Sequence, residues 1–109
     1  MKYSVRILPN FEREAKPLLK KYSSLKNELL LLFEILETSP GTGISLGKNC
    51  YKIRVAISSK GKGKSGGARI ITCFVIERET VYLLSIYDKS EHENITPQQL
   101  QSWVNTIAK

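Results

Sequence analysis

A pliable, positively charged stretch in the middle of the chain is the first candidate for chemistry. Residues 58–71, SSKGKGKSGGARII, alternate lysine with glycine and end in an arginine that enters an apolar run. Glycine allows backbone N–H groups to approach an anion closely, and lysine neutralises the charge of that anion. The same composition is also typical of a solvated hairpin tip. The stretch therefore predicts either a phosphate contact or a plain surface loop.

The excess positive charge of the chain is concentrated around this stretch. The net charge is +7, and residues 38–76 contain no Asp or Glu, whereas the rest of the chain has equal numbers of basic and acidic residues. Charge that serves only solubility is spread over the whole surface, so this pattern favours a polyanion or an acidic protein as the partner. The basic residues of this window are Lys48, Lys52, Arg54, Lys60, Lys62, Lys64 and Arg69.

Arg54 and Arg69 lie in predicted strands, at positions where a charged side chain requires a partner. Arg54 lies on the polar face of an alternating segment, and Arg69 begins a segment that is otherwise apolar. A charge at the edge of a core is costly without partners, and no acid lies nearby in the sequence. A structural ion pair with a distant acid is one explanation. An anionic ligand is the other, because the planar guanidinium donates two hydrogen bonds to phosphate.

Further polar groups follow an apolar segment in the order Tyr87, Asp88, Lys89, Glu91 and His92. Tyr87 is expected either to stack on a base or to cap the core. His92, the only histidine, is more typical of a surface residue than of a general base in this polar setting. Lys89 and Glu91 are expected to form a surface pair.

This residue set lacks a Ser/His/Asp nucleophile and a close carboxylate pair, yet it suits one reaction. In RNA, the 2′-hydroxyl can attack its own adjacent phosphate, so the protein needs to orient that attack and stabilise charge on the phosphoryl oxygens. A lysine whose pKa is lowered by neighbouring cations could move the protons. Arginines, lysines and a tyrosine around a concave sheet are therefore compatible with RNA cleavage.

Composition excludes several other classes of site. The chain has 109 residues and is 41% apolar, which fits one domain over residues 1–109. It has no apolar run of the roughly 20 residues that span a membrane and no secretory pattern, so we expect a cytoplasmic location and two free thiols, Cys50 and Cys73. No His/Cys cluster is present, and we expect neither a metal nor another cofactor. The GKS at residues 63–65 is not a nucleotide-binding loop, because Ser58 stands where that motif needs glycine.

The elements that position these residues follow from the spacing of apolar side chains. Residues 3–8 alternate as a strand, and residues 11–22 and 25–38 have helical periodicity. Asn10 is expected to cap the first helix, in which Pro17 predicts a kink or a later start.

A loop over residues 39–49 leads to three strands and a final helix. Short connections make the strands an antiparallel meander. Thr96, Pro97 and Gln99 form a strong helix start with a capping box. The fold class is α+β, with an N-terminal strand and a helical hairpin packed on a mostly antiparallel four-stranded sheet, and a short C-terminal helix. The later strands and the helix are predicted at residues 51–57, 68–77, 81–88 and 95–109.

The second half of the chain resembles a known family of toxins. The segments YKIRVAISSKGKGKSGGARIITCFV and VYLLSIYDKSE, within residues 51–94, resemble the RelE/ParE superfamily of toxin–antitoxin toxins, and most of all its HigB-type branch. The resemblance implies a compact RelE-like α+β domain. It also implies a metal-independent endoribonuclease, an mRNA interferase, that enters the ribosomal A site and cuts the mRNA there, leaving a 2′,3′-cyclic phosphate and a 5′-hydroxyl.

The resemblance also implies roles for individual residues. Arg69 matches an arginine that contacts the scissile phosphate, Arg54 matches a basic strand position, and Lys89 matches a basic residue after the last strand. Ala56 and Ser90 depart from the pattern, since the best-studied members have lysine and arginine there, so proton transfer is expected to pass to a loop lysine or Lys89. The residues expected to be catalytic are Arg54, Arg69, Lys64 and Lys89. The residues expected to bind RNA or the ribosome are Lys48, Lys52, Lys60, Lys62 and Tyr87.

The partners implied by the resemblance are the ribosome, mRNA and a cognate antitoxin. The antitoxin is expected to be a small helix-turn-helix protein encoded in the adjacent reading frame, which covers the basic face with an acidic segment or displaces the C-terminal helix. Two other functions stay open. A ParE-like inhibitor of DNA gyrase shares the fold but needs no arginine pair, and a non-catalytic module would bind RNA or the ribosome without cutting.

Overall fold

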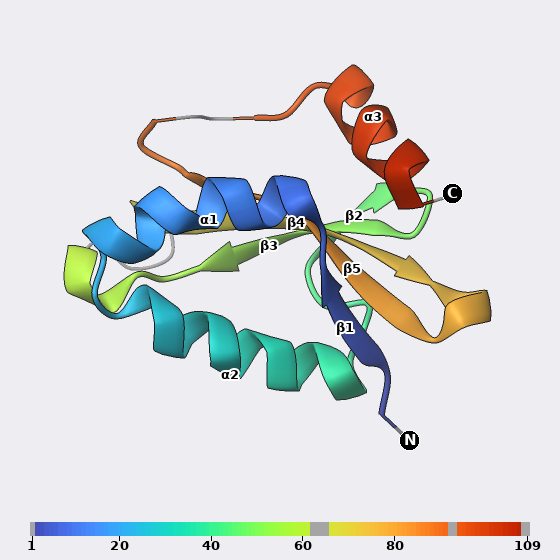
Figure 1. Ribbon diagram of the computed structural model, residues 1–109, viewed down its shortest axis with the longest axis horizontal. Coiled ribbons are helices and arrows are strands. Elements are labelled where there is room, and N and C mark those ends of the chain that lie inside the picture. The colour runs from blue at the N-terminus through green and yellow to red at the C-terminus, as the bar shows by residue number, and fades with distance from the viewer. Residues whose placement is uncertain (1, 62–65, 92–93, 108–109) are drawn as a thin grey trace.

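The computed structural model describes residues 2–61, 66–91 and 94–107, which form a five-stranded sheet with helices on both sides (Figure 1). Of the helices in these described residues, none is long and apolar enough to cross a membrane. The strands are β1 (Ser4–Ile7), β2 (Ile44–Gly47), β3 (Cys50–Val55), β4 (Ala68–Val75) and β5 (Thr80–Asp88). The helices are α1 (Pro9–Lys21), α2 (Leu25–Thr38) and α3 (Pro97–Ile107).

The strand order is β1-β5-β4-β3-β2, in which β1 runs parallel to β5 and all other neighbours are antiparallel. This topology confirms the predicted α+β class and the mostly antiparallel sheet. β5 is buried along its whole length, as expected for a strand that is apolar on both faces. The N-terminal strand and β2 therefore form the two edges of the sheet.

The prediction of four strands was wrong, because residues 44–47 form a fifth strand, β2, inside the segment that its composition marked as a loop. β2 joins β3 through a tight turn at Lys48 and Asn49, whose φ angles are 54° and 60°. Two successive positive φ angles match the twist of a hairpin. Since β2 is a short, largely exposed edge strand, it lacks the buried apolar alternation by which strands are recognised.

Helix α1 also differs from its prediction. It begins at Pro9, where the missing N–H is no loss, so Asn10 lies in the first turn and does not cap the helix. Asn10 instead donates from Nδ2 to the carbonyl oxygen of Leu84 on β5, at 2.9 Å. The helix continues through Pro17 to Lys21, so the predicted later start was wrong. Helix α1 is thus fixed along β5.

Two apolar clusters lie on the two faces of the sheet. Figure 1 shows α2 on one side of the sheet and α3 on the other. Helices α1 and α2 bury the larger cluster against the sheet, and its centre includes Phe11, Leu25, Leu36, Ile70 and Leu83. On the opposite face, Ile107 of α3 packs on a smaller cluster that contains the free thiols Cys50 and Cys73.

The start of α3 follows its prediction. The backbone N–H of Thr96 donates to Oε1 of Gln99 at 2.9 Å, and the N–H of Gln99 donates to Oγ1 of Thr96 at 3.1 Å. This reciprocal pair is the predicted capping box, with Pro97 at the first helical position. Helix α3 therefore covers one end of its face of the sheet and leaves the other end for the site described next.

Candidate functional site

The register of three adjacent strands brings three of the predicted site residues into one row. Arg54 on β3 lies opposite Arg69 on β4, and Arg69 lies opposite Tyr87 on β5. Directly opposed residues of antiparallel strands point to the same face, with Cβ atoms about 5 Å apart. This face is the one that carries α3, because Tyr87 belongs to the cluster beneath that helix. These residues are called the arginine–tyrosine row below.

Arg69 is the most firmly held member of the row. Its side chain is buried, with a residue exposure of 4%, and Nη1 donates to the carbonyl oxygen of Ala68 at 3.2 Å. The backbone just before β4 packs very tightly on the end of β3, since a Cβ on Gly67 would lie 2.1 Å from the carbonyl oxygen of Val55. Only glycine allows this approach. Arg69 therefore projects from rigid backbone at the point where the loop ends and the sheet begins.

Tyr87 and Arg54 lie at the two ends of the row. Burial raises the pKa of the Tyr87 phenol, and the positive charge of Arg69 opposes this effect without cancelling it. Tyr87 therefore keeps its proton at neutral pH and can donate it in a hydrogen bond. Arg54 is exposed, so the row runs from a buried phenol to a solvent-facing guanidinium.

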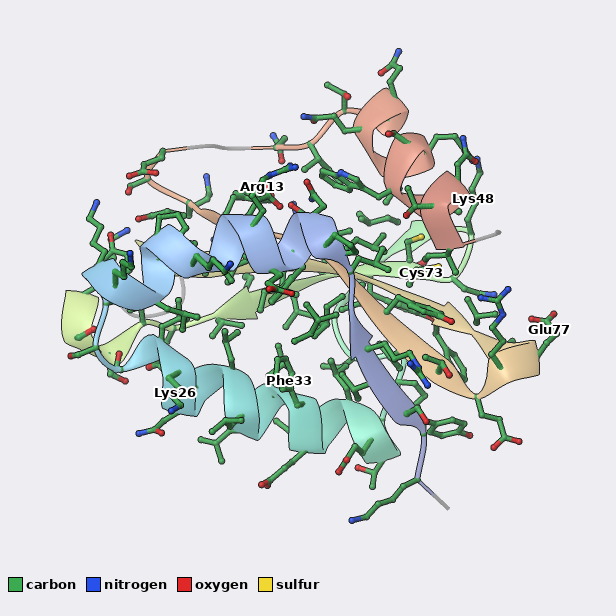
Figure 2. The ribbon with its side chains drawn as sticks, in the orientation of Figure 1. Arg13, Lys26, Phe33, Lys48, Cys73 and Glu77 are labelled. Carbon is green, nitrogen blue, oxygen red and sulfur yellow. The ribbon has the colours of Figure 1, made fainter. Side chains whose placement is uncertain are left out.

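The other basic residues that the sequence singled out are spread around this row. Lys52 lies two residues before Arg54, on the same face of β3, and is partly exposed. Lys89 is also partly exposed, and its backbone N–H donates to the carbonyl oxygen of Gly67 at 3.0 Å. Lys48 lies farther away at the β2–β3 turn, where its ammonium donates to Gln101 of α3 (Figure 2).

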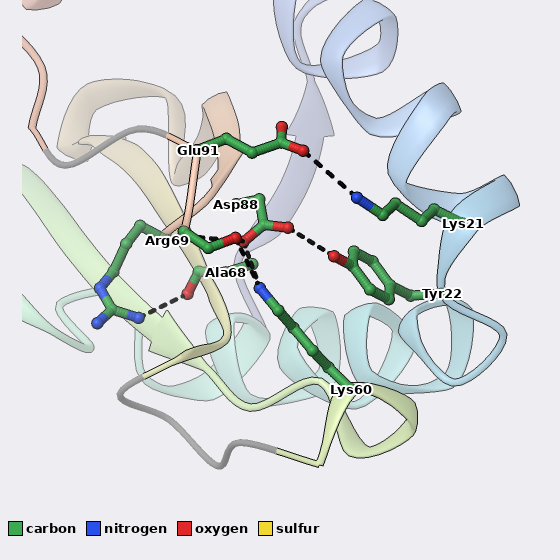
Figure 3. Close-up of polar contacts among 8 residues, drawn as sticks. Lys21, Tyr22, Lys60, Ala68, Arg69, Asp88 and Glu91 are labelled. Carbon is green, nitrogen blue, oxygen red and sulfur yellow. Dashed lines mark hydrogen bonds and ion pairs between the residues drawn. The ribbon is translucent and has the colours of Figure 1, made fainter.

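Lys60 has a partner that the sequence did not reveal. Its Nζ lies 2.5 Å from Oδ1 of Asp88, and both side chains are almost fully buried (Figure 3). Lys60 also donates to Oγ of Ser90 at 3.1 Å, while the hydroxyl of Tyr22 donates to Oδ2 of Asp88 at 2.7 Å. The ion pair ties the first part of the loop to the end of β5. The ammonium of Lys60 is therefore already neutralised in this structure.

The electrostatics of Asp88 follow from these contacts. Burial by itself would raise the pKa of the Asp88 carboxyl, but hydrogen bonds from Lys60, Tyr22 and Ser90 outweigh burial and hold that pKa well below its usual range. Asp88 is therefore ionised at all physiological pH values. A buried acid at the end of an apolar strand was the available sequence signal, because such a group needs a cation.

Several expectations fall on residues whose structure is not described. Lys62 and Lys64, predicted to bind RNA and to take part in catalysis, lie outside the described residues, as does His92. Glu91, expected to pair with Lys89, forms its ion pair with Lys21 at 3.4 Å. In the part of the chain that the structure describes, no group of three or more His, Cys, Asp or Glu side chains is placed to hold a metal ion.

The geometry can bind an anion with two oxygens or more. A phosphate above Arg69 would lie within reach of the exposed guanidinium of Arg54 and of the Tyr87 phenol, since all three project from the same face. The hydrogen-bond donors to such an anion would project from the strands of the sheet. The row carries positive charge and a protonated phenol, which can stabilise negative charge on a bound anion.

Comparison with known proteins assigns the chain to a family. The model of the family described as "RelE toxin of RelE / RelB toxin-antitoxin system" matches residues 10–109. The chain belongs to the RelE toxin family. This agrees with the resemblance at residues 51–94 and extends it to the N-terminal helices, whereas the HigB-type branch stays a prediction.

Solved structures of RelE proteins share the fold. A mutant of E. coli toxin RelE in the free state matches with a TM-score of 0.62 and 18% identity over 98% of this chain and 99% of that chain. The isolated E. coli RelE toxin matches with a TM-score of 0.54 and 21% identity over 96% and 98%. The toxin–antitoxin complex RelBE2 from Mycobacterium tuberculosis matches with a TM-score of 0.55 and 17% identity over 81% and 92%. At these identities the likeness shows the RelE fold.

Proposed function

We propose that this RelE-family toxin is a ribosome-dependent mRNA endonuclease that cuts translated mRNA in the A site. The observation that carries the proposal is the arginine–tyrosine row, in which two guanidinium groups project from adjacent strands of a rigid sheet. The acid-free window that surrounds this row supports it, since a polyanion is the partner such a window favours. The type of reaction is proposed from the resemblance of the sequence to ribonucleolytic RelE toxins.

The reaction requires charge stabilisation, orientation of the phosphate and proton transfer, and the row can supply the first two. The 2′-oxygen attacks the adjacent phosphorus, the bond from phosphorus to the 5′-oxygen breaks, and the products are a 2′,3′-cyclic phosphate and a 5′-hydroxyl. Arg69 and Arg54 hold the non-bridging oxygens and stabilise the charge that builds on them. Arg69 also fixes the phosphate relative to the sheet, because the backbone just before β4 is closely packed on Val55 at Gly67.

The third requirement is proton transfer: a base removes the proton of the 2′-hydroxyl, and an acid protonates the leaving 5′-oxygen. Lys89 and Lys64 are the residues we assign to it, and Lys89 lies directly after the strand that carries Tyr87. The ribosome then contributes the extended mRNA conformation that in-line attack requires, in the cytoplasm where translation takes place.

The decisive experiment compares arginine variants in cells. We expect wild-type protein to produce new mRNA 5′ ends inside translated reading frames, and Arg69→Ala or Arg54→Ala to reduce these cuts by about 100-fold or more, as loss of a charge-stabilising donor does. Arg13→Ala is the matched control, since Arg13 is an exposed arginine on α1 and is not part of the row. Growth arrest without codon-associated cuts would contradict the proposal. Arrest with gyrase-linked DNA breaks that survive Arg69→Ala would instead identify a ParE-like inhibitor.

We further propose that a cognate antitoxin neutralises the protein. The family description names a toxin–antitoxin system, and the RelBE2 structure from Mycobacterium tuberculosis is such a complex. The acid-free window offers an acidic segment a complementary surface. Co-expression of the product of the adjacent reading frame should restore growth and co-purify with the toxin. Failure of that product to bind the purified protein would exclude it as the antitoxin.

A further inference from the structure

Two cysteines lie directly opposite each other on adjacent strands of the sheet. Cys50 on β3 is the register partner of Cys73 on β4. Both side chains are buried, and both thiols are free, in the apolar cluster on which Ile107 of α3 packs. Figure 2 shows Cys73 on the side of the sheet that carries α3. The reaction proposed above uses neither thiol, so the pair is available for a chemistry of its own.

The backbone register places the two cysteines at the spacing of a disulfide bond. The N–H of Phe74 donates to the carbonyl oxygen of Asn49 at 2.9 Å, which makes these two residues a hydrogen-bonded pair of the ladder. Because hydrogen-bonded and non-hydrogen-bonded pairs alternate along antiparallel strands, the next pair, Cys50 and Cys73, is a non-hydrogen-bonded one. The Cα atoms of such pairs are about 4.5 Å apart, within the range of about 4.4–6.8 Å that disulfides span. A bridge therefore needs little movement of either strand.

The two sulfur atoms also lie close to the same group. The thiol of Cys50 donates to the carbonyl oxygen of Lys48 at 3.6 Å, and the thiol of Cys73 contacts the same oxygen at 4.0 Å. A hydrogen bond between the two thiols lowers the pKa of Cys73 and raises the pKa of Cys50. The side chain of Cys73 is also 5% exposed, whereas that of Cys50 is fully buried. Cys73 is therefore the thiol that forms a thiolate more readily and meets a small oxidant first.

We propose that Cys50 and Cys73 form a reversible oxidation site, in which a peroxide converts the two thiols into an intramolecular disulfide that stabilises the β3–β4 hairpin. The sulfur of Cys73 attacks one oxygen of hydrogen peroxide, the O–O bond breaks, water is released and Cys73 becomes a sulfenic acid. The sulfur of Cys50 then attacks that sulfur, the S–O bond breaks, and a second water is released as the disulfide forms. The two thiols lose two electrons and two hydrogen atoms, and the peroxide takes them up as two molecules of water.

The bridge would close a loop, residues 50–73, that contains both arginines of the row. A disulfide stabilises a protein mainly because it restricts the unfolded chain. Since the bridged residues already face each other, the register of Arg54 with Arg69 stays as it is. In a reducing compartment such a bond is transient and forms under oxidising conditions. The oxidised protein should therefore keep its row and resist unfolding, and this holds whether or not the protein cuts mRNA.

Mass spectrometry of the full-length protein tests the bond directly. The reduced protein is treated with hydrogen peroxide, and we expect a mass loss of about 2 Da, the two hydrogen atoms, which dithiothreitol restores. Trypsin releases the peptides NCYK (49–52) and IITCFVIER (70–78), which carry one cysteine each and should be found joined. Two unchanged thiols under conditions that oxidise free cysteine completely would overturn the proposal. Disulfide-linked dimers, or oxygen added to Cys73 while Cys50 stays reduced, would overturn it as well.

Thermal unfolding tests the stabilising role of the bond. Peroxide treatment should raise the Tm of the wild-type protein by about 5 °C or more, and dithiothreitol should reverse the rise. The control is Cys50→Ser, which keeps one thiol and should show no rise. Cys50→Ala repeats this control without a buried hydroxyl, in case the serine destabilises the fold. A bridged protein that unfolds at the temperature of the reduced one would overturn the stabilising role, and so would an equal rise in the single-cysteine variants.

Discussion

Lys60 and Asp88 lie at the base of the lysine–glycine loop, where a buried ion pair holds the loop to the end of β5. The sequence suggested an RNA contact for Lys60, and the structure gives its ammonium three neighbours in the protein, namely Asp88, Ser90 and the ring of Tyr22. A charge that is neutralised from within adds little to the attraction of a polyanion. We therefore interpret Lys60 as the anchor of the loop.

Loss of one partner of this pair should destabilise the protein. Lys60→Met leaves the Asp88 carboxylate buried without its cation, which typically costs about 3–5 kcal/mol. We expect the lower end of this range, because Tyr22 and Ser90 still donate to Asp88. Urea unfolding of Lys60→Met measures the loss, and Lys26→Met, at an exposed position on α2, serves as the control. Equal stability of the two variants would show that the pair contributes nothing.

The same pair should make stability depend on acid pH. The folded pKa of Asp88 lies below its unfolded value of about 3.9, so the stabilisation is complete above that pH and is lost as the pH falls through the folded pKa. Thermal unfolding between pH 5 and pH 2 should show a steeper loss for wild type than for Asp88→Asn, which has no proton to bind at this position. Parallel curves for the two proteins would contradict the depressed pKa.

Among the elements, the start of β4 determines where Arg69 points. Gly67→Ala would place a methyl group 2.1 Å from the carbonyl oxygen of Val55, so the end of β3 and the start of β4 must separate. Forced packing of this kind costs about 1–3 kcal/mol, and we expect loss of mRNA cutting together with it. Gly41→Ala is the control, because its methyl group would make an ordinary contact of 3.4 Å with Tyr51. Full activity of Gly67→Ala would show that the position of Arg69 is less constrained than the packing indicates.

The elements also show how far the sequence could predict the site. Alternation identified β3, apolar runs on both faces identified β4 and β5, and the Thr96–Gln99 box identified the start of α3. The arginines were recognised one by one, because a charge at the edge of a core is a local signal. Their alignment with Tyr87 depends on register, which no local pattern contains. Asp88 and Lys60, which are 28 residues apart, became partners only through the fold.

For the molecule as a whole, the salt dependence of binding should distinguish the basic residues. A lysine that contacts a phosphate of single-stranded RNA contributes about 0.7 to the slope of log affinity against log salt. Lys52→Gln should therefore reduce the slope by about that amount, because Lys52 is partly exposed beside the row. Lys60→Met should leave the slope unchanged, since Asp88 neutralises Lys60. Binding to ribosomes, measured between 50 and 200 mM salt at a temperature where both variants are folded, provides the test. A reduced slope for Lys60→Met would return Lys60 to the RNA-binding residues.

The parallel pairing of β1 with β5 has a consequence for the folding of the chain during its synthesis. Ser4 to Ile7 find their partners at Thr80 to Leu83, so the first strand to leave the ribosome waits for β5 before it can enter the sheet. The arginine–tyrosine row is likewise incomplete until β5 supplies Tyr87. A nascent chain that ends before β5 has neither a closed sheet nor a complete site. The closure of the sheet and the completion of the row are therefore both delayed until β5 has been synthesised.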